Sequence, residues 1–150
     1  SALPEFTDPE QFQSMVLNST NTYRVQHGAQ PVVFNSTLAA FADDVTKACK
    51  MEHSGGPFGE NLAIGCRDLD GCIELWGNER DLYDFDAGLF SKDTGHFSQL
   101  VWKSTTDVGC AARFCADNGS RGSWYLVCEY WPRGNVKGQF VEMVGKQVEG

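Results

Sequence analysis

Two histidines and two glutamates are the side chains in this sequence best suited to bind a metal ion. His53 and His96 lie at expected helix boundaries, Glu79 falls on the apolar face of an expected helix, and Glu60 begins an extended segment. A carboxylate that faces the protein interior must be paired, hydrogen-bonded or protonated. If the four side chains converge, the imidazole nitrogens suit Zn²⁺ or another divalent cation, and a carboxylate can orient water.

Each histidine also has an ordinary structural explanation. His96 lies one turn before Leu100, at the edge of an apolar stripe, where a buried ring often bonds to a carbonyl. His53 is explained equally well as a helix-end residue. His27, beside Gly28, is expected to be a cation favoured by the helix dipole and to need no further role. The spacing matches no short metal-binding motif, so spacing alone leaves the choice open.

Hydrophobic periodicity and capping residues predict the elements that must position these side chains. Asp8 caps the first helix, Pro9 suits its first position, and Gly28 ends it. Four helices are expected over residues 8–28, 35–50, 71–83 and 94–102, with extended segments at 32–34 and 60–64. Two strands, 108–114 and 124–130, flank a hairpin loop at 116–122.

Six cysteines without a Cys-x-x-Cys pair indicate three disulfides, for which the sequence allows about fifteen pairings. Symmetric pairing of the two strands about Gly119 puts Cys110 opposite Cys128. Cys115 is an odd number of residues from Cys110, so its side chain points to the other sheet face and can reach Cys49 on a helix packed there. A disulfide between Cys66 and Cys72 would close a small local loop. The preferred set of disulfides is therefore Cys49–Cys115, Cys66–Cys72 and Cys110–Cys128.

Composition and charge exclude several classes of protein. A formal net charge of -8, without a Lys/Arg cluster, argues against nucleic acid as a partner. No apolar run approaches the length of a membrane span, no signal peptide is recognised, and the start at Ser1 is expected to be a processed or trimmed end. Three sequons, at Asn18, Asn35 and Asn118, together with the even cysteine count, favour a secreted glycoprotein.

These elements predict an α+β fold. Four helices and a hairpin-based sheet suggest a layered domain in which a central antiparallel sheet lies between helices and disulfides staple the layers. The chain length is that of a single domain, residues 1–150.

Four motifs resemble those of the CAP superfamily, which comprises cysteine-rich secretory proteins, antigen 5 and plant pathogenesis-related 1 proteins. They are Gly95–Trp102, Tyr125–Asn135, Gly59–Ala63 and His53-Ser54. The resemblance runs from the first helix to about Gly138. The sequence of residues 76–102 looks most like that of the fungal secreted members. One position departs from the family: Thr20 stands where the motif His-Asn-x-x-Arg has its histidine.

The resemblance implies an α-β-α sandwich, the CAP fold, with a central cavity in which His53, Glu60, Glu79 and His96 meet. It implies that Zn²⁺ or another divalent cation binds there, chiefly through His53 and His96. The departure at Thr20 is then a loss at a supporting position, because the four cavity residues are intact.

The resemblance also implies a small hydrophobic ligand, a sterol or a fatty acid. A sterol-binding loop is expected at residues 65–73, bounded by Cys66 and Cys72. A sterol needs a mainly apolar wall, and this loop supplies little of one, because it is acidic and Leu69 is its one leucine. The resemblance also implies that a fatty acid can bind between the first and fourth helices, in a groove lined by Phe12, Met15, Val16, Phe97 and Val101. Apolar residues in such a pattern are more often simply part of the core.

Two other functions compete with lipid binding. One is a metal-dependent hydrolase or protease, in which a metal-bound water and a glutamate supply the Lewis acid and the base. Ser54 and Ser98 adjoin the histidines, but no nucleophile elbow is recognised. The other is a disulfide-stapled scaffold that displays its loops to a host or cell-wall partner. No catalytic residue is assigned.

Overall fold

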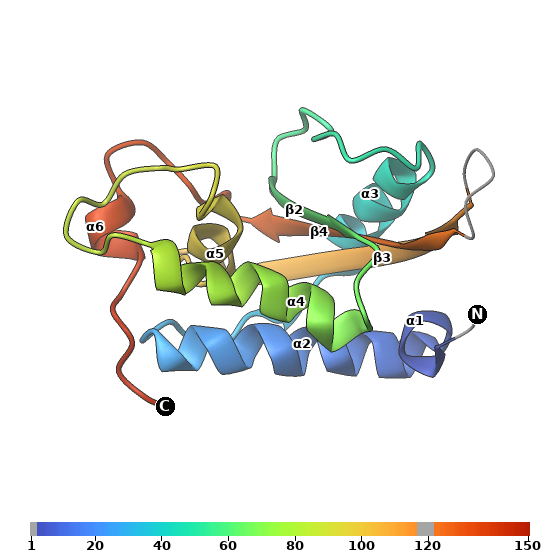
Figure 1. Ribbon diagram of the computed structural model, residues 1–150, viewed down its shortest axis with the longest axis horizontal. Helices are drawn as coiled ribbons and strands as arrows, with labels where there is room; N and C mark the ends of the chain where they lie inside the picture. The colour runs from blue at the N-terminus through green and yellow to red at the C-terminus, as the bar shows by residue number, and fades with distance from the viewer. Residues whose placement is uncertain (1–2, 117–121) are drawn as a thin grey trace.

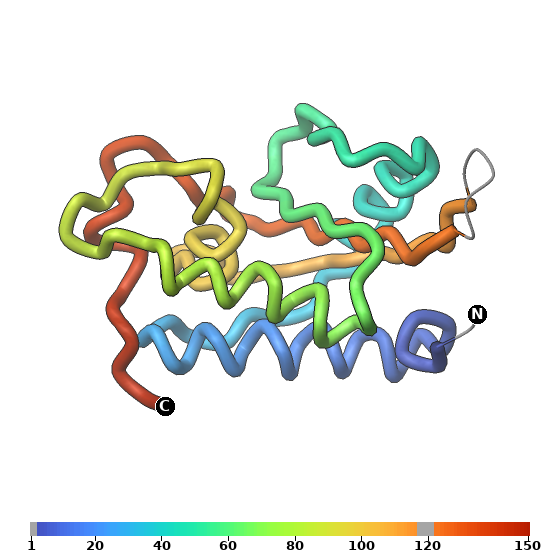
Figure 2. The backbone as a smooth tube through the Cα atoms, in the orientation of Figure 1, coloured from blue at the N-terminus to red at the C-terminus, as the bar shows by residue number. Residues whose placement is uncertain are grey.

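The computed structural model describes residues 3–116 and 122–150, and these form three layers (Figure 1). A four-stranded sheet of order β1-β3-β4-β2 lies between α3 on one face and α2, α4 and α5 on the other (Figures 1 and 2). The α-β-α sandwich predicted from the sequence is confirmed. The elements are α1 (Pro4–Thr7), α2 (Pro9–Gln26), β1 (Val33–Phe34), α3 (Ser36–Thr46), β2 (Gly59–Ile64), α4 (Leu69–Gly77), the 3₁₀ helix η1 (Asn78–Leu82), α5 (Gly95–Leu100), β3 (Asp107–Cys115), β4 (Ser123–Trp131) and α6 (Phe140–Met143).

The sheet is built on the predicted hairpin. β3 and β4 pair antiparallel in a register that places Cys110 opposite Cys128. β2 pairs antiparallel with the other side of β4 and forms an edge of the sheet. The short β1 differs from the expectation of a purely antiparallel sheet, because it runs parallel to β3. The hairpin loop lies mostly at 117–121, outside the described residues.

All three predicted disulfides are confirmed. Cys49–Cys115 joins the segment after α3 to the end of β3, Cys110–Cys128 links the hairpin strands, and Cys66–Cys72 closes a local ring at the start of α4. Cys115 packs in the small core under α3, whereas Cys110 packs in the larger core on the opposite face. The alternation of side chains along β3 therefore determines which half of the sandwich each cysteine reaches.

Two helix boundaries differ from the prediction for local reasons. α3 ends at Thr46 instead of Lys50, because Cys49 has a φ of 51° and cannot continue a right-handed helix. α4 begins at Leu69 instead of Gly71, because the Asp68 carboxylate caps it by accepting from the backbone N–H of Gly71 at 2.7 Å. The expected loop at 65–73 is thus partly helical. The α-helix gives way to η1 after Gly77.

α3 lies unusually close to the sheet at Gly109. A Cβ at this position would stand 2.2 Å from the backbone nitrogen of Ala39 and 2.5 Å from the carbonyl oxygen of Asn35. Glycine therefore permits direct backbone packing, and the N-terminal turn of α3 covers the neighbouring part of β4.

Arg24, on α2, ties its helix to the segment that follows α5. Its side chain is fully buried, and it donates hydrogen bonds to the carbonyl oxygens of Gln30, Leu100, Trp102 and Thr105 at 2.7–3.0 Å. A buried guanidinium is tolerated only where its donors are satisfied, and carbonyls do so here. The side chain thereby fixes where α5 ends relative to α2.

The predicted glycosylation sites have different surroundings. Asn18 is exposed on α2. Asn35 caps α3 by accepting from the backbone N–H groups of Thr37 and Leu38, and its amide also donates to Asp107. Asn118 lies outside the described residues. In the described part of the chain, no helix has the length and apolar character needed to cross a bilayer.

Candidate metal centre

His53 and Glu60 form the first of two histidine–carboxylate pairs. His53 lies in the loop between α3 and β2, and Glu60 is the second residue of β2. The imidazole Nδ1 is 2.9 Å from Glu60 Oε1, and the same oxygen accepts the backbone N–H of Ser54 at 2.9 Å. The carboxylate is nearly buried while the imidazole is largely exposed, so the glutamate holds a ring that still meets solvent.

His96 and Glu79 form the second pair. His96 is the second residue of α5, and its Nδ1 is 2.7 Å from Oε2 of Glu79 in η1. The other oxygen of Glu79 accepts the backbone N–H of Phe97 at 3.0 Å. The indole of Trp76 stacks near the imidazole, with ring centroids 6.0 Å apart. The prediction that Glu79 on the apolar face needs a partner is confirmed, since the partner is His96.

The two histidines line one hollow of about 130 Å³, together with Glu60, Asn61 and Asn135. Because each Nδ1 is engaged by a glutamate, Nε2 is the ring nitrogen left to bind a ligand on both residues. These residues fit a divalent cation held by two imidazoles. Among the described residues, no set of three or more His, Cys, Asp or Glu side chains is placed to hold a metal ion alone. The other coordination positions would thus belong to water or to a ligand.

Asparagine side chains hold α5 against the edge of the sheet. The buried Asn61 donates to the backbone carbonyl of His96 at 3.1 Å and to the Tyr130 hydroxyl at 3.3 Å. Asn135 donates to the carbonyl of Gly95 at 3.0 Å. These contacts fix the helix that carries His96 with respect to the strand that carries Glu60. Thr20, the position at which the family motif has histidine, does not line the hollow.

The His53–Glu60 pair has a defined pH dependence. The hydrogen bond to Glu60 raises the pKa of His53 above its ordinary value of 6.5. Burial raises the pKa of Glu60, but hydrogen bonds from His53, Glu129 and Ser54 outweigh it and hold the pKa at about 2. Because the pKa of His53 is raised in the folded protein, protonated His53 stabilises the fold, and this stabilisation is lost as pH rises through that pKa. Because the pKa of Glu60 is lowered, its ionised carboxylate also stabilises the fold, and this stabilisation is lost as pH falls toward about 2.

We therefore expect the His53 ring to titrate above pH 6.5 in the metal-free protein and to return toward 6.5 in Glu60→Gln. NMR titration of the ring resonances measures both values. Titration of His53 at or below 6.5 in the wild-type protein would contradict the pairing.

His27 differs from the prediction of a helix-end cation. Its side chain is buried, Nδ1 lies 2.9 Å from the carbonyl oxygen of Gly145, and the ring packs edge-on against Phe97. Burial lowers the pKa of His27, which favours the neutral ring. The hydrophobic surroundings come from the C-terminal segment and α5, which the local sequence around Gly28 does not indicate.

The serines beside the histidines do not form a nucleophilic pair. Ser54 Oγ accepts the backbone N–H of Gly56 at 3.1 Å. Ser98 Oγ donates to Asn135 Oδ1 at 2.6 Å. Neither hydroxyl bonds to an imidazole within the described residues, so the geometry gives no support to a serine hydrolase.

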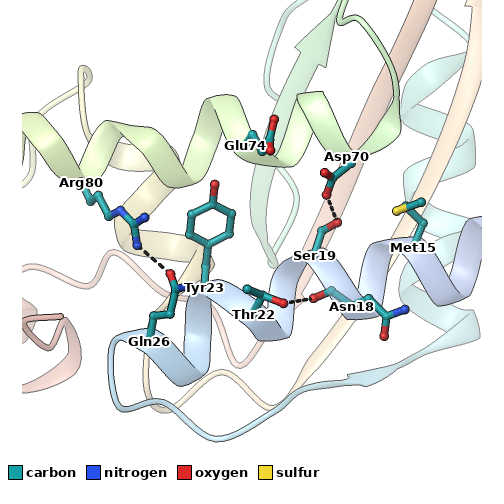
Figure 3. A pocket seen from close by; sticks show the side chains of 9 residues that line it. All are labelled: Met15, Asn18, Ser19, Thr22, Tyr23, Gln26, Asp70, Glu74 and Arg80. Carbon is teal, nitrogen blue, oxygen red and sulfur yellow. Dashed lines mark hydrogen bonds between the residues drawn. The ribbon is translucent and has the colours of Figure 1, made fainter. Parts of the chain in front are cut away.

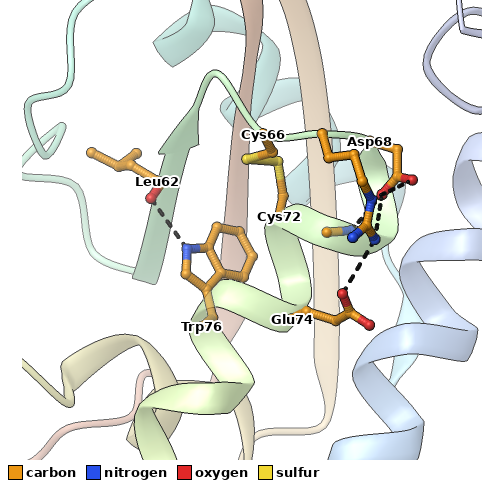
Figure 4. Close-up of a disulfide and its surroundings, with 8 residues drawn as sticks. Leu62, Cys66, Asp68, Cys72, Glu74 and Trp76 are labelled. Carbon is orange, nitrogen blue, oxygen red and sulfur yellow. Dashed lines mark hydrogen bonds and ion pairs between the residues drawn. A yellow bond between two sulfur atoms is a disulfide. The ribbon is translucent and has the colours of Figure 1, made fainter.

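Most residues expected to bind lipid are packed in the core. Six of the eight are buried in the larger cluster: Phe12, Val16, Leu69, Cys72, Phe97 and Val101. Figure 4 shows Cys66 and Cys72 joined beside Trp76, whose indole N–H donates to the carbonyl of Leu62 at 3.2 Å. Leu69, the one leucine of the expected sterol loop, is fully buried because α4 begins at this residue.

The groove between α2 and α4 is lined mainly by residues with polar side chains (Figure 3). It holds about 390 Å³, and of the expected fatty-acid residues only Met15 lines it. Asp70 and Glu74 face it from α4, and Ser19 on α2 donates to Asp70. The groove predicted for a fatty acid lay elsewhere, between residues 8–28 and 94–102, which form α2 and α5; there Phe12, Val16, Phe97 and Val101 are buried in the larger core.

A more apolar hollow lies beside the histidines. It holds about 350 Å³, and Leu89, Phe90, Phe140 and Lys137 are among the residues that line it. Phe90 and Asn135 line both this hollow and the one shared by the histidines. Leu89 is 71% exposed and Phe90 58% exposed, although both are large apolar side chains. Sequence reasoning missed this surface because residues 84–94 have no periodicity that marks them as a unit.

Comparison with known proteins identifies the class to which this fold and site belong. The solved structure of hookworm platelet inhibitor has a TM-score of 0.72 at 20% identity and covers 98% of this chain and 78% of its own. A crystal structure of NaASP2 with Zn²⁺ has a TM-score of 0.71 at 21% identity, with 90% and 86% coverage. These similarities establish the fold.

Sequence relatives establish the family. The model of CAP, the cysteine-rich secretory protein family, matches residues 17–130. Protein PRY2 of Saccharomyces cerevisiae is 38% identical over 140 residues, which cover 89% of this chain and 41% of that protein. Pathogenesis-related protein 1 of Arabidopsis thaliana is 35% identical, with 85% and 80% coverage. The chain belongs to the CAP family, and it spans less than half the length of its fungal relative PRY2.

Proposed function

We propose that this CAP domain binds a divalent cation, such as Zn²⁺, through Nε2 of His53 and Nε2 of His96. One observation carries the proposal: both rings line the same hollow, and each is oriented by a glutamate at its Nδ1. A carboxylate at the far nitrogen fixes the tautomer and raises the basicity of a ligating imidazole. When bound, the cation would polarise a water molecule or a ligand group in the hollow.

Relatives are consistent with this proposal. The solved structure of NaASP2, with the same fold, contains Zn²⁺. We also propose that the domain acts outside the cell, because it has three disulfides and a Candida albicans relative, 37% identical, is named Secreted protein RBT4. The partner on a host or a cell wall stays a prediction.

Isothermal titration of Zn²⁺ into the metal-free protein tests the metal site. Loss of either imidazole, in His53→Ala or His96→Ala, is expected to weaken binding by at least about 100-fold, because even partners of ligands are worth 10–100-fold. Binding is also expected to weaken as pH falls through the pKa of His53, which lies above 6.5, because this imidazole must be neutral to ligate.

His27→Gln is the matched control for this titration. It removes the third imidazole, which lies outside the hollow, and is expected to leave zinc affinity unchanged if circular dichroism shows a native fold. Equal zinc affinity in the wild-type protein and in the double variant His53→Ala/His96→Ala would refute the proposal.

A second candidate function is binding of a small apolar ligand, a sterol or a fatty acid, in the hollow of Leu89, Phe90 and Phe140. The observation that favours it is the exposure of two large apolar side chains around a hollow of about 350 Å³ that adjoins the histidines. Exposed apolar surface of this kind is typical of a ligand or partner site. None of the residues that the resemblance indicated for lipid binding lines this hollow.

Titration with a solubilised sterol and with a long-chain fatty acid tests this candidate. Leu89→Ser is expected to weaken binding about tenfold, the effect of losing one buried leucine contact. Leu75→Ser, at a leucine on α4 that is also largely exposed, is the control and is expected to change nothing. The absence of binding of both compounds to the wild-type protein would remove the candidate.

A further inference from the structure

Glu129, which the sequence analysis did not single out, lies beside Glu60 within the sheet. The two are direct partners in the antiparallel register of β2 and β4, so their side chains point to the same face. That face is covered by α3, which packs against Gly109, the partner of Glu129 on β3. Glu129 is consequently 0% exposed.

The oxygen atoms of the two glutamates are unequally engaged. Glu60 Oε1 accepts from His53 and from the backbone N–H of Ser54. Glu60 Oε2 and both oxygens of Glu129 are buried without another hydrogen-bond partner among the described residues. Two facing carboxylates in a dry environment cannot both be ionised, so one of them holds a proton that bonds the pair.

A cation between the carboxylates is the alternative to a proton. It would need further oxygen or nitrogen ligands, and no third metal-ligating side chain is placed to join the pair in the described part of the chain. Burial, a hydrogen bond to Glu60 and the charge of Glu60 all raise the pKa of Glu129. Glu60 Oε1 already faces two donors, His53 Nδ1 and the backbone N–H of Ser54, which favour a carboxylate there, whereas neither oxygen of Glu129 faces a donor among the described residues.

The Glu79–His96 pair provides an internal comparison. There, one oxygen of the glutamate bonds to the imidazole and the other accepts the backbone N–H of Phe97, so both oxygens are fixed. In the Glu60–His53 pair, no backbone N–H bonds to the second oxygen within the described residues. A protonated carboxyl group on Glu129, the strand partner of Glu60, would supply the donor that this second oxygen lacks.

We propose that Glu129 is a positioning residue: its neutral carboxyl group donates a hydrogen bond to Glu60 Oε2, which holds Glu60 Oε1 toward His53 Nδ1 and leaves His53 Nε2 as the free nitrogen. The consequence for zinc rests on the proposed function. The hydrogen-bonded chain from Glu129 through Glu60 to His53 does not require a metal.

Two variants of matched length test the role of Glu129. Glu129→Gln keeps a donor toward Glu60, whereas Glu129→Met keeps the bulk and removes the donor. In metal-free protein, at a pH where His53 is neutral, we expect nitrogen NMR to find the Nδ1–H tautomer of His53 in the wild type and in Glu129→Gln. In Glu129→Met we expect a shift toward the Nε2–H tautomer and an approximately tenfold loss of zinc affinity.

Infrared spectroscopy provides a second test that does not depend on the folding of Glu129→Met. The wild type at neutral pH is expected to have the band of a protonated carboxyl group, which Glu129→Gln lacks. The proposal is overturned if that difference is missing, if Glu129→Met keeps the Nδ1–H tautomer, or if Glu129→Gln shifts the tautomer as much as Glu129→Met.

The outcomes separate this proposal from the metal site. If the wild type fails to bind zinc while the tautomer and infrared results are as expected, the metal proposal fails and the positioning role stands. If zinc binds through the histidines while Glu129→Met leaves His53 unchanged, the positioning role fails and the metal proposal stands.

Discussion

Replacement of Arg24 with methionine is expected to lower the free energy of unfolding by about 3–5 kcal/mol, because it leaves several buried carbonyl groups without a donor. The side chain is fully buried and bonds to four carbonyl oxygens, at Gln30, Leu100, Trp102 and Thr105. Leu100 is the last residue of α5, and Trp102 and Thr105 follow it, so the loss also frees the helix that carries His96. Urea denaturation followed by circular dichroism measures the change.

Arg113→Met is the matched control for the Arg24 variant. The Arg113 side chain is 39% exposed, lies 3.9 Å from Asp43 and donates to Thr46 at 3.3 Å. Its loss is expected to cost less than about 1 kcal/mol, as for other exposed ion pairs. Equal costs at the two positions would mean that the buried hydrogen bonds of Arg24 are not the source of its effect.

Removal of the Cys49–Cys115 disulfide in the double alanine variant is expected to cost about 4 kcal/mol, mainly through the greater chain entropy of the unfolded state. This crosslink spans 66 residues and ties the end of α3 to β3. A chemical denaturation curve of each variant, recorded without reductant, gives the difference.

The Cys66–Cys72 disulfide is the control, because it spans only 6 residues. Its removal is expected to cost about 2 kcal/mol on the same entropic scale. A larger loss at the short ring than at the long one would show that local packing, not loop length, determines the contribution of these crosslinks.

Features governed by neighbouring residues were predictable from the sequence. Asp8 and Gly28 bound α2 as their capping preferences indicate, and the alternation of side chains along β3 assigned Cys110 and Cys115 to opposite faces. The motif resemblance then indicated that His53, Glu60, Glu79 and His96 meet, and the structure pairs each histidine with one of the glutamates.

Features that depend on long-range pairing were not predictable. Glu129 is distinguished from any other strand residue only by the register of β2 on β4. No short turn joins these two strands, which are far apart in the chain, so the sequence does not indicate their register. The fully buried state of His27 depends on the C-terminal segment around Gly145, far away in the chain. The apolar residues expected to bind lipid share their periodicity with core residues, since burial by protein and burial by a ligand leave the same pattern.

The position of β2 at the edge of the sheet has a consequence for association between copies of the chain. An unpaired edge strand is a template to which another polypeptide can add by backbone hydrogen bonding. The loop bearing His53 approaches β2 from one face, and α5 approaches from the other, bound by Asn61. The cation proposed above for His53 and His96 would connect these two sides of the edge strand and so hinder the addition of another strand.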